Sequence, residues 1–225
     1  MLLALDTSSP TVTVAVHDGA DVVAEAASES TMRHGEQLAP LVDRVLREAG
    51  ATPRDLTAIA VGVGPGPFTG LRVGLVTART MAHVLSIPVY GACSLDVLAV
   101  EAVDRGTVTG GFVVATDARR KEVYLASYDD AGRRTAGPDV QRPDAVATGA
   151  PVVGEGAALY PDAFPDGRAP LRPSAGWLAR TVVEERAELN DPEPLYLRRP
   201  DAEVPRAPKP VLRDASSLGS SGTVS

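Results

Sequence analysis

Several reactive and charged residue types are scarce in this chain. Among 225 residues there are one cysteine, three histidines and two lysines. A single cysteine, Cys93, excludes an internal disulfide framework and fits a reducing compartment. The histidines match neither an HExxH nor an HxxxH pattern, so we expect surface or interface residues and no paired imidazole ligands. They are His17, His34 and His83.

Long hydrophobic runs are also missing, and positive charge is in deficit. The first residues, MLLALDTSS, carry no positive leader and their apolar run stops at Asp6, so we expect neither a signal peptide nor a membrane span, and a cytoplasmic location. The net charge of −7 argues against a protein that holds nucleic acid through its own surface, because such proteins cluster positive charge to replace phosphate counterions. If RNA is involved, another protein should carry most of the contact.

The hydrophobic residues that are present follow an α/β pattern. Strands are predicted over residues 2–5, 11–16, 22–27, 58–63 and 89–92, and helices over 34–49, 69–85 and 95–103. In the first of these helices the apolar residues recur at the spacing of one amphipathic face, ended by Gly50. The order is therefore three strands, a helix, a strand and a helix.

The second half of the chain repeats the beginning of the first. A shift of 111 residues lays Asp6 on Asp117 and Asp18 on Asp129, and both segments read as strand, Asp, turn, strand, Asp. We predict two related lobes, residues 1–106 and a smaller, eroded lobe at 107–205. Residues 133–148 are polar and broken by proline, and the last clear helix is predicted over 177–185. The segment 206–225 has no apolar periodicity and is predicted to be a disordered tail.

A glycine-rich junction, AVGVGPGPFTGLRVGL at residues 60–75, raises the question of a phosphate site. It lacks the Lys of a Walker loop, and its glycines do not fit G-x-G-x-x-G, so both standard phosphate motifs fail. The helix that follows carries small residues four apart, at Gly70, Gly74, Ala78 and Ala82. This stripe allows close approach of another backbone, and spacing alone favours packing on the chain's own sheet over contact with a partner.

Three segments together resemble the bacterial TsaB (YeaZ) family. They are LALDTSS at the N-terminus, GPGPFTGLRVGLVTARTMAHVLSIPVYGACSLDVLA, and PLYLRRPD far downstream. The resemblance covers roughly residues 1–205 and is strongest over 1–100. It implies an α/β fold of two ribonuclease H-like lobes in the actin/sugar-kinase/Hsp70-like (ASKHA) superfamily. It also implies a non-catalytic role beside TsaD in making N6-threonylcarbamoyladenosine at position 37 of tRNAs that read ANN codons.

The resemblance implies that this chain lacks a catalytic metal centre and any cofactor. The catalytic paralogue carries Asn-His-Leu-x-x-His after a similar helix, and its two histidines hold the metal. Ser94 and Leu98 stand at the matching positions here, and neither supplies an imidazole. Cys93, with no adjacent histidine, is not a credible nucleophile.

Asp6 and Asp117 leave a nucleotide site open as an alternative. In kinases of this superfamily the two corresponding loops face one another and handle Mg²⁺ and phosphate. The simpler interpretation is that Asp6, Thr7 and Ser8 form a capped turn, and we favour it because the loop after Asp117 has no glycine to bring amides to a phosphate. An ATP-dependent phosphotransferase, and less favourably an M22-type metallopeptidase, remain the alternatives to a scaffold.

The resemblance also implies partners. TsaB-type proteins are expected to pair with TsaD through the first two helices, here 34–49 and 69–85. The resemblance further implies contact with a TsaE-type ATPase, and a homodimer when TsaD is absent. We expect this chain to reach tRNA only through the complex and to make no contact with a membrane. The expected interface residues are Leu38, Leu41, Val42, Val45, Gly70, Gly74, Ala78 and Ala82.

Overall fold

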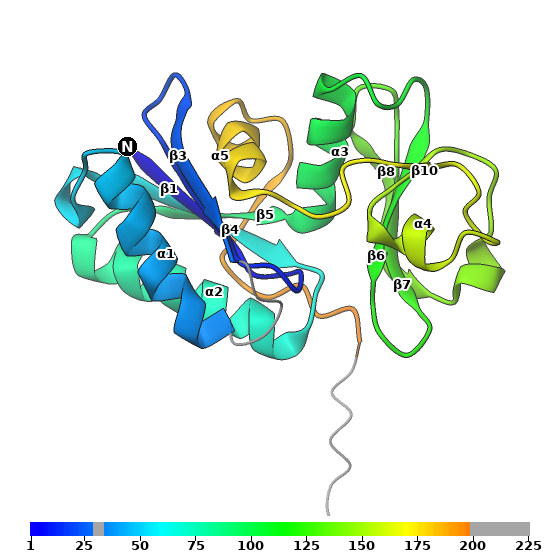
Figure 1. Ribbon diagram of the computed structural model, residues 1–225, viewed down its shortest axis with the longest axis horizontal. Coiled ribbons are helices and arrows are strands. Elements are labelled where there is room, and N and C mark those ends of the chain that lie inside the picture. The colour runs from blue at the N-terminus through cyan, green and yellow to red at the C-terminus, as the bar shows by residue number, and fades with distance from the viewer. Residues whose placement is uncertain (29–33, 199–225) are drawn as a thin grey trace, which may run out of the picture.

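The computed structural model describes residues 1–28 and 34–198 as two α/β lobes that lie side by side (Figure 1). The tail predicted at 206–225 lies outside the described residues. Two 3₁₀ turns, η1 (Pro53–Asp55) and η2 (Pro143–Val146), join larger elements.

The N-terminal lobe is built on a six-stranded sheet in the order β11-β5-β4-β1-β2-β3. Two helices, α1 (His34–Glu48) and α2 (Phe68–Leu85), cover one face, and α5 (Ala175–Val183) packs on the other (Figure 1). β1 and β2 are buried along their whole length because helices cover both faces of the sheet. The strands are β1 (Leu2–Asp6), β2 (Thr13–His17), β3 (Val22–Ala27), β4 (Ala58–Gly64), β5 (Val89–Cys93) and β11 (Leu189–Asn190).

The C-terminal lobe repeats this arrangement with five strands in the order β10-β9-β6-β7-β8. In both lobes an antiparallel meander is followed by parallel strands beside its first strand, β4 beside β1 and β9 beside β6. This shared ribonuclease H-like order supports the internal repeat found in the sequence. The strands are β6 (Phe112–Asp117), β7 (Val123–Tyr128), β8 (Arg134–Gln141), β9 (Val152–Val153) and β10 (Gly167–Arg168), with α4 (Glu155–Leu159) between the last two.

Matching turns in the two lobes also support the repeat. The backbone N–H of Ser8 donates to Asp6 Oδ1, and that of Arg119 donates to Asp117 Oδ1, each over 2.8 Å. Asp18 and Asp129 accept from the residue two positions on in the same way. The four aspartates therefore occupy equivalent turns, where a short side chain caps its own backbone.

The division of the chain between the lobes differs from the predicted boundary. After residue 173 the chain returns to the N-terminal lobe, where α5 packs on the first sheet and β11 pairs with β5. The range 107–205 is therefore not one continuous lobe. Helix α3 (Ser94–Asp104) lies between the lobes, since Val97 joins the core of the first and Leu98 that of the second.

Strand β8 is missing from the sequence prediction. It contains Gly137 and Pro138 and is mostly exposed, so neither alternation nor hydrophobicity marks it. It forms because it pairs along one side with β7 as an edge strand, a position that tolerates proline.

Candidate functional site

The carboxylate of Asp6, at the end of β1, is fully used inside the chain. Oδ1 accepts from the Ser8 backbone N–H at 2.8 Å and from Ser8 Oγ at 2.7 Å, while Oδ2 accepts from Ser94 Oγ at 2.6 Å. Asp6 is 1% exposed. These contacts support the capped-turn interpretation and leave this carboxylate buried among the chain's own donors.

The glycines of the junction permit this close packing. A Cβ at Gly62 would overlap the Asp6 carboxylate, and one at Gly66 would overlap the backbone carbonyl of Ser8. Both positions therefore require glycine for steric reasons. The glycine-rich stretch packs the loop after β1 against the start of α2, and this role accounts for it without a phosphate.

The small-residue stripe of α2 faces the same loop. Thr7 Oγ1 donates to the carbonyl oxygen of Gly70 over 2.8 Å, and a Cβ at Gly74 would collide with Thr7 Oγ1. Ala78 and Ala82 belong to the core between α2 and the sheet. The stripe is thus occupied by the chain's own β1 and the loop that follows it.

All eight expected interface residues are buried, and this corrects the expectation that they face a partner. The four from α1 lie in the same core as those of α2, because the apolar face of an amphipathic helix turns toward the sheet beneath it. They are Leu38, Leu41, Val42, Val45, Gly70, Gly74, Ala78 and Ala82.

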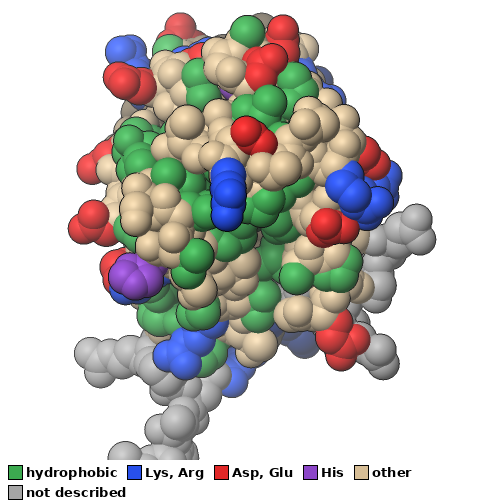
Figure 2. Space-filling view, turned by 90° about the vertical axis from the view of Figure 1, so that its left-hand side faces the viewer, with side chains coloured by type: hydrophobic (Ala, Val, Ile, Leu, Met, Phe, Trp, Pro, Cys, Tyr) green, Lys and Arg blue, Asp and Glu red, His purple; other side chains and the backbone are tan. Residues whose placement is uncertain are grey.

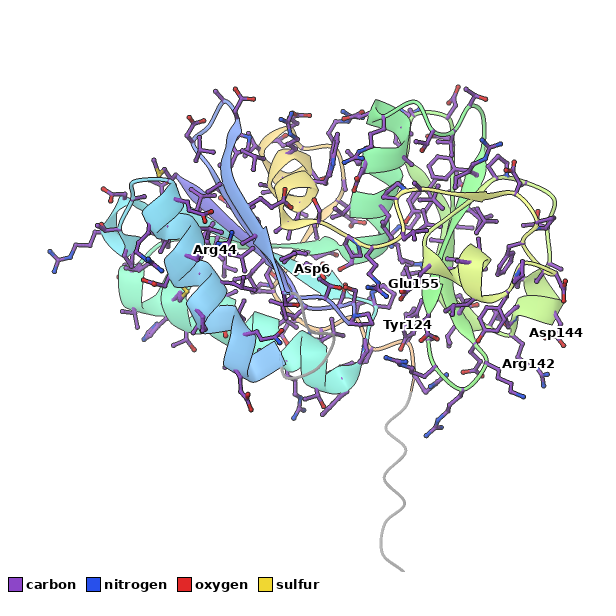
Figure 3. The ribbon with its side chains drawn as sticks, in the orientation of Figure 1. Asp6, Arg44, Tyr124, Arg142, Asp144 and Glu155 are labelled. Atoms are coloured by element: carbon purple, nitrogen blue, oxygen red, sulfur yellow. The ribbon has the colours of Figure 1, made fainter. Side chains whose placement is uncertain are left out.

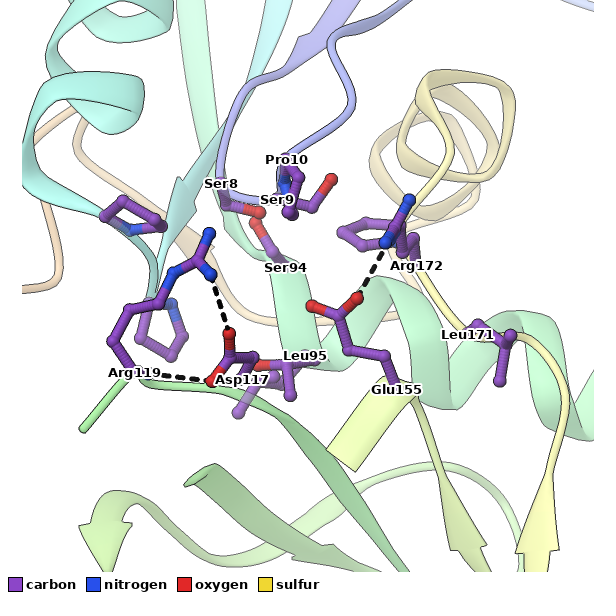
Figure 4. A pocket seen from close by; sticks show the side chains of 14 residues that line it. Ser8, Ser9, Pro10, Ser94, Leu95, Asp117, Arg119, Glu155, Leu171 and Arg172 are labelled. Carbon is purple, nitrogen blue, oxygen red and sulfur yellow. Dashed lines mark hydrogen bonds and ion pairs between the residues drawn. The ribbon is translucent and has the colours of Figure 1, made fainter. Parts of the chain in front are cut away.

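Asp117 lies at the hollow between the lobes, apart from the buried Asp6. Its side chain accepts from the Arg119 backbone and pairs with the Arg119 guanidinium at 3.3 Å (Figure 4). Glu155 lines the same hollow from the same lobe and pairs with Arg172 at 2.9 Å, and Arg172 also donates to Thr11 of the N-terminal lobe at 3.2 Å. Figure 3 shows Asp6 and Glu155 on the facing sides of the two lobes.

The hollow between the lobes is too small for a nucleotide. Ser8, Ser94 and Asp117 line it together with residues of both lobes, yet its volume is about 10 Å³. That is close to the least space that holds one water molecule. In this arrangement of the lobes the residues expected at a nucleotide site close the space between them.

Ser94 and Leu98, which the resemblance sets at the metal-ligand positions of the catalytic paralogue, are buried and engaged elsewhere. Ser94 is held by Asp6, and Leu98 packs in the core shared with the second lobe. Burial raises the pKa of the Cys93 thiol to about 12, so it stays protonated at neutral pH. His17 is buried as well, contrary to the expected surface or interface position, and its Nδ1 accepts from the Gly19 backbone N–H at 3.0 Å.

The solvent-facing side of α2 carries large apolar residues that the sequence interpretation missed. Phe68, Val76 and Val84 are 46%, 62% and 73% exposed. They recur every eight residues, twice the four-residue spacing of the small stripe, and this shared spacing is the signal that marks a second stripe opposite it. Figure 2 shows the outer end of this lobe, where hydrophobic side chains are mixed with uncharged ones over the middle and most charged side chains lie near the margin.

The chain's last described segment borders the exposed stripe. Tyr196 stacks on Phe68 with ring centroids 5.2 Å apart, and the Arg72 guanidinium lies 3.9 Å from the Phe68 ring centre on α2. Glu193 pairs with Arg79 at 2.7 Å. Between this segment and α2 lies an open groove of about 520 Å³, lined by Leu75 and Val76 among others. Aromatic, aliphatic and arginine groups of this kind are typical of protein-binding surfaces.

Comparison with known proteins decides the family. A family model described as "TsaD: tRNA N6-adenosine threonylcarbamoyltransferase" matches residues 21–163. The solved structure of YeaZ from Pseudomonas aeruginosa superposes with a TM-score of 0.71 at 31% identity, covering 87% of this chain and 99% of that one. This chain belongs to the TsaB (YeaZ) family.

Two curated relatives are also similar to this chain. An uncharacterized protein of Mycobacterium tuberculosis (strain ATCC 25618 / H37Rv) is 43% identical over 212 residues, 89% of this chain and 93% of the relative. The "tRNA threonylcarbamoyladenosine biosynthesis protein TsaB" of Bacillus subtilis (strain 168) is 35% identical over 128 residues, 56% of this chain and 54% of the relative.

The TsaB assignment agrees with the architecture. The two lobes have the α/β fold of the ASKHA superfamily, as the resemblance implied. None of the helices in residues 1–28 and 34–198 has the length and apolar character needed to cross a bilayer.

Proposed function

We propose that this chain is a non-catalytic scaffold subunit for threonylcarbamoyl transfer to adenosine 37 of tRNAs that read ANN codons. It binds and supports a TsaD-type catalytic subunit in the cytoplasm. The name of the Bacillus subtilis relative supports the pathway. The filled hollow between the lobes is the observation that supports a non-catalytic role, because Asp6 is tied to Ser8 and Ser94 and only about 10 Å³ remains there.

The alternatives have less support from the same residues. A phosphotransferase needs space for a nucleotide between the lobes, and a metallopeptidase needs nitrogen or carboxylate ligands where Ser94 and Leu98 stand. Opening of the lobes would have to break the Arg172 contact with Thr11 before a nucleotide could enter.

The partner surface proposed here is the outward side of the first two helices. On α2 it comprises Phe68, Val76 and Val84, together with Tyr196 from the last described segment. On α1 the outward side carries two pairs of opposite charge, Arg44 with Glu48 and Arg47 with Asp43. Exposed apolar residues flanked by charge fit an interface with a hydrophobic centre and a polar rim. A TsaE-type ATPase would join the assembled pair, and a homodimer through this face is the expected form when TsaD is absent.

Pull-down with the TsaD-type subunit tests this surface. Val76→Glu should weaken association at least tenfold, since a buried carboxylate without a partner is costly at an interface. Val23→Glu is the matched control, because Val23 is 41% exposed and lies on β3, away from α2. Equal binding of both variants, with unfolding midpoints like that of the wild type, would contradict the proposed surface.

A further inference from the structure

The loop between β6 and β7 holds three cationic residues in an unusual backbone conformation. Arg119, Arg120 and Lys121 have φ angles of 61°, 55° and 61°, and all three are exposed. Residues other than glycine, asparagine and aspartate rarely adopt this left-handed conformation, and runs of three are rarer still. The loop therefore keeps these side chains at a cost in backbone energy.

Glycine residues would adopt the backbone conformation of this loop with less strain. The chain has 21 glycines, and two of them take a positive φ in other hairpins, Gly19 at 109° between β2 and β3 and Gly132 at 74° between β7 and β8. Strain that persists where a glycine turn would serve points to a function for the side chains.

The loop forms a positive site on a chain whose net charge is −7. Its two flanking carboxylates are already neutralised, Asp117 by Arg119 at 3.3 Å and Glu122 by Arg198. Lys121 makes no ion pair within the part of the chain that the structure describes, and it lines a hollow of about 500 Å³ together with Arg142 and the carboxylates of Asp144 and Asp162. Arg142 and Asp144, labelled in Figure 3 at the outer end of this lobe, pair with each other at 3.3 Å.

The position of the loop connects it with the proposed partner surface. Arg119 shares the wall of the hollow between the lobes with Pro65 and Pro67, and Pro67 directly precedes α2. The loop and the start of α2 both lie at the lower edge of the molecule in Figure 1. The cations of this loop therefore lie on the same edge of the molecule as the start of the helix that carries the proposed partner surface.

We infer that the β6–β7 loop contacts the phosphate backbone of RNA bound to the assembled complex. Arg and Lys are the side chains that hold RNA phosphates, and exposed cations contribute without reading sequence. The inference rests on the proposed function. Because the net charge of this chain is negative, the partner makes most of the contacts with RNA, and this loop adds a local contact. An acidic protein surface is the competing occupant.

Charge reversal in the complex with the TsaD-type subunit tests this inference. For Arg120→Glu/Lys121→Glu we expect tRNA affinity at about 0.1 M salt to fall about tenfold or more, and the slope of log K against log salt to become less negative by about 2. Arg133→Glu is the control, since Arg133 is 77% exposed in the turn at the opposite end of β7. It should change neither quantity.

A second variant separates charge from folding. Lys121→Gly removes one cation and relieves a left-handed residue, so it should raise the thermal midpoint by a few degrees and still weaken tRNA binding. Unchanged affinity and slope in a complex that assembles normally would overturn this inference alone. Weaker association with the partner in the absence of RNA would overturn it in favour of an acidic protein surface. A wild-type chain that fails to join the complex would contradict the proposed function as well.

Discussion

Ser94 Oγ donates to Asp6 Oδ2 across 2.6 Å and so joins the end of β1 to the first residue of α3, 88 positions later in the chain. The same carboxylate also holds both the backbone and the hydroxyl of Ser8. Asp6 thus connects the first sheet to the helix between the lobes, and its charge is satisfied by donors of the chain itself.

Removal of this carboxylate should destabilise the protein. Asp6→Ala leaves buried donors of Ser8 and Ser94 without an acceptor, so we expect the free energy of unfolding to fall by about 2–4 kcal/mol. Asp6→Asn keeps one acceptor oxygen and should cost less. Urea denaturation measures both. Equal stability of Asp6→Ala and the wild type would show that the hydrogen bonds of Asp6 with Ser8 and Ser94 do not stabilise the protein.

The stripe of small residues gives a second test of packing. Gly74→Ala should lower stability by about 1–3 kcal/mol, because the new methyl group overlaps Thr7 Oγ1. Gly35→Ala on α1 is the matched control: its Cβ would meet only Val73 Cγ2, at 4.0 Å, so helix propensity should stabilise it by up to about 1 kcal/mol. Chemical denaturation of the two variants should therefore give opposite signs, and a stabilising Gly74→Ala would contradict the packing described here.

Glu101 makes stability depend on pH. Burial raises the pKa of this α3 carboxyl to about 7, although Arg105, 2.9 Å away, favours the charged form. The folded state then binds a proton that the unfolded chain, with a pKa near 4.5, has already released. Stability from this group is therefore present below about pH 4.5 and is lost as pH rises through about 7.

Substitution of Glu101 isolates this contribution. Between pH 5 and pH 8 the wild type should lose about 1–3 kcal/mol of its free energy of unfolding through the ionisation of Glu101. Glu101→Gln should not lose this amount, so its stability relative to the wild type should increase as pH rises. Thermal melts across that range supply the measurement. A difference between the two proteins that stays constant with pH would mean that Glu101 does not titrate there.

Much of the N-terminal lobe could be predicted from the sequence. The helices around Leu38 and Leu75 have strong apolar periodicity, and the strands between them are short and hydrophobic. The correspondence of Asp6 with Asp117 could also be predicted from the sequence, because the two aspartates cap equivalent turns in the two lobes.

The direction of the α2 stripes could not be read in the same way. Gly70, Gly74, Ala78 and Ala82 recur every four residues, and Phe68, Val76 and Val84 lie on the opposite side at multiples of the same period. Spacing favours packing of the small stripe on the chain's own sheet, and its contacts with Thr7 and Leu5, more than sixty residues earlier, place it there. The contacts of Tyr196 with α2 are equally long-range and leave no local pattern.

The most direct test of the scaffold claim is reconstituted threonylcarbamoyl transfer to tRNA with purified subunits, measured as modified adenosine 37. The TsaD-type subunit with its ATPase should give little product alone, and addition of this chain should restore transfer. Asp6→Asn, in folded protein, should restore it as well as the wild type, and Val76→Glu should restore it poorly. Full activity without this chain, or product formed by this chain alone, would contradict the account.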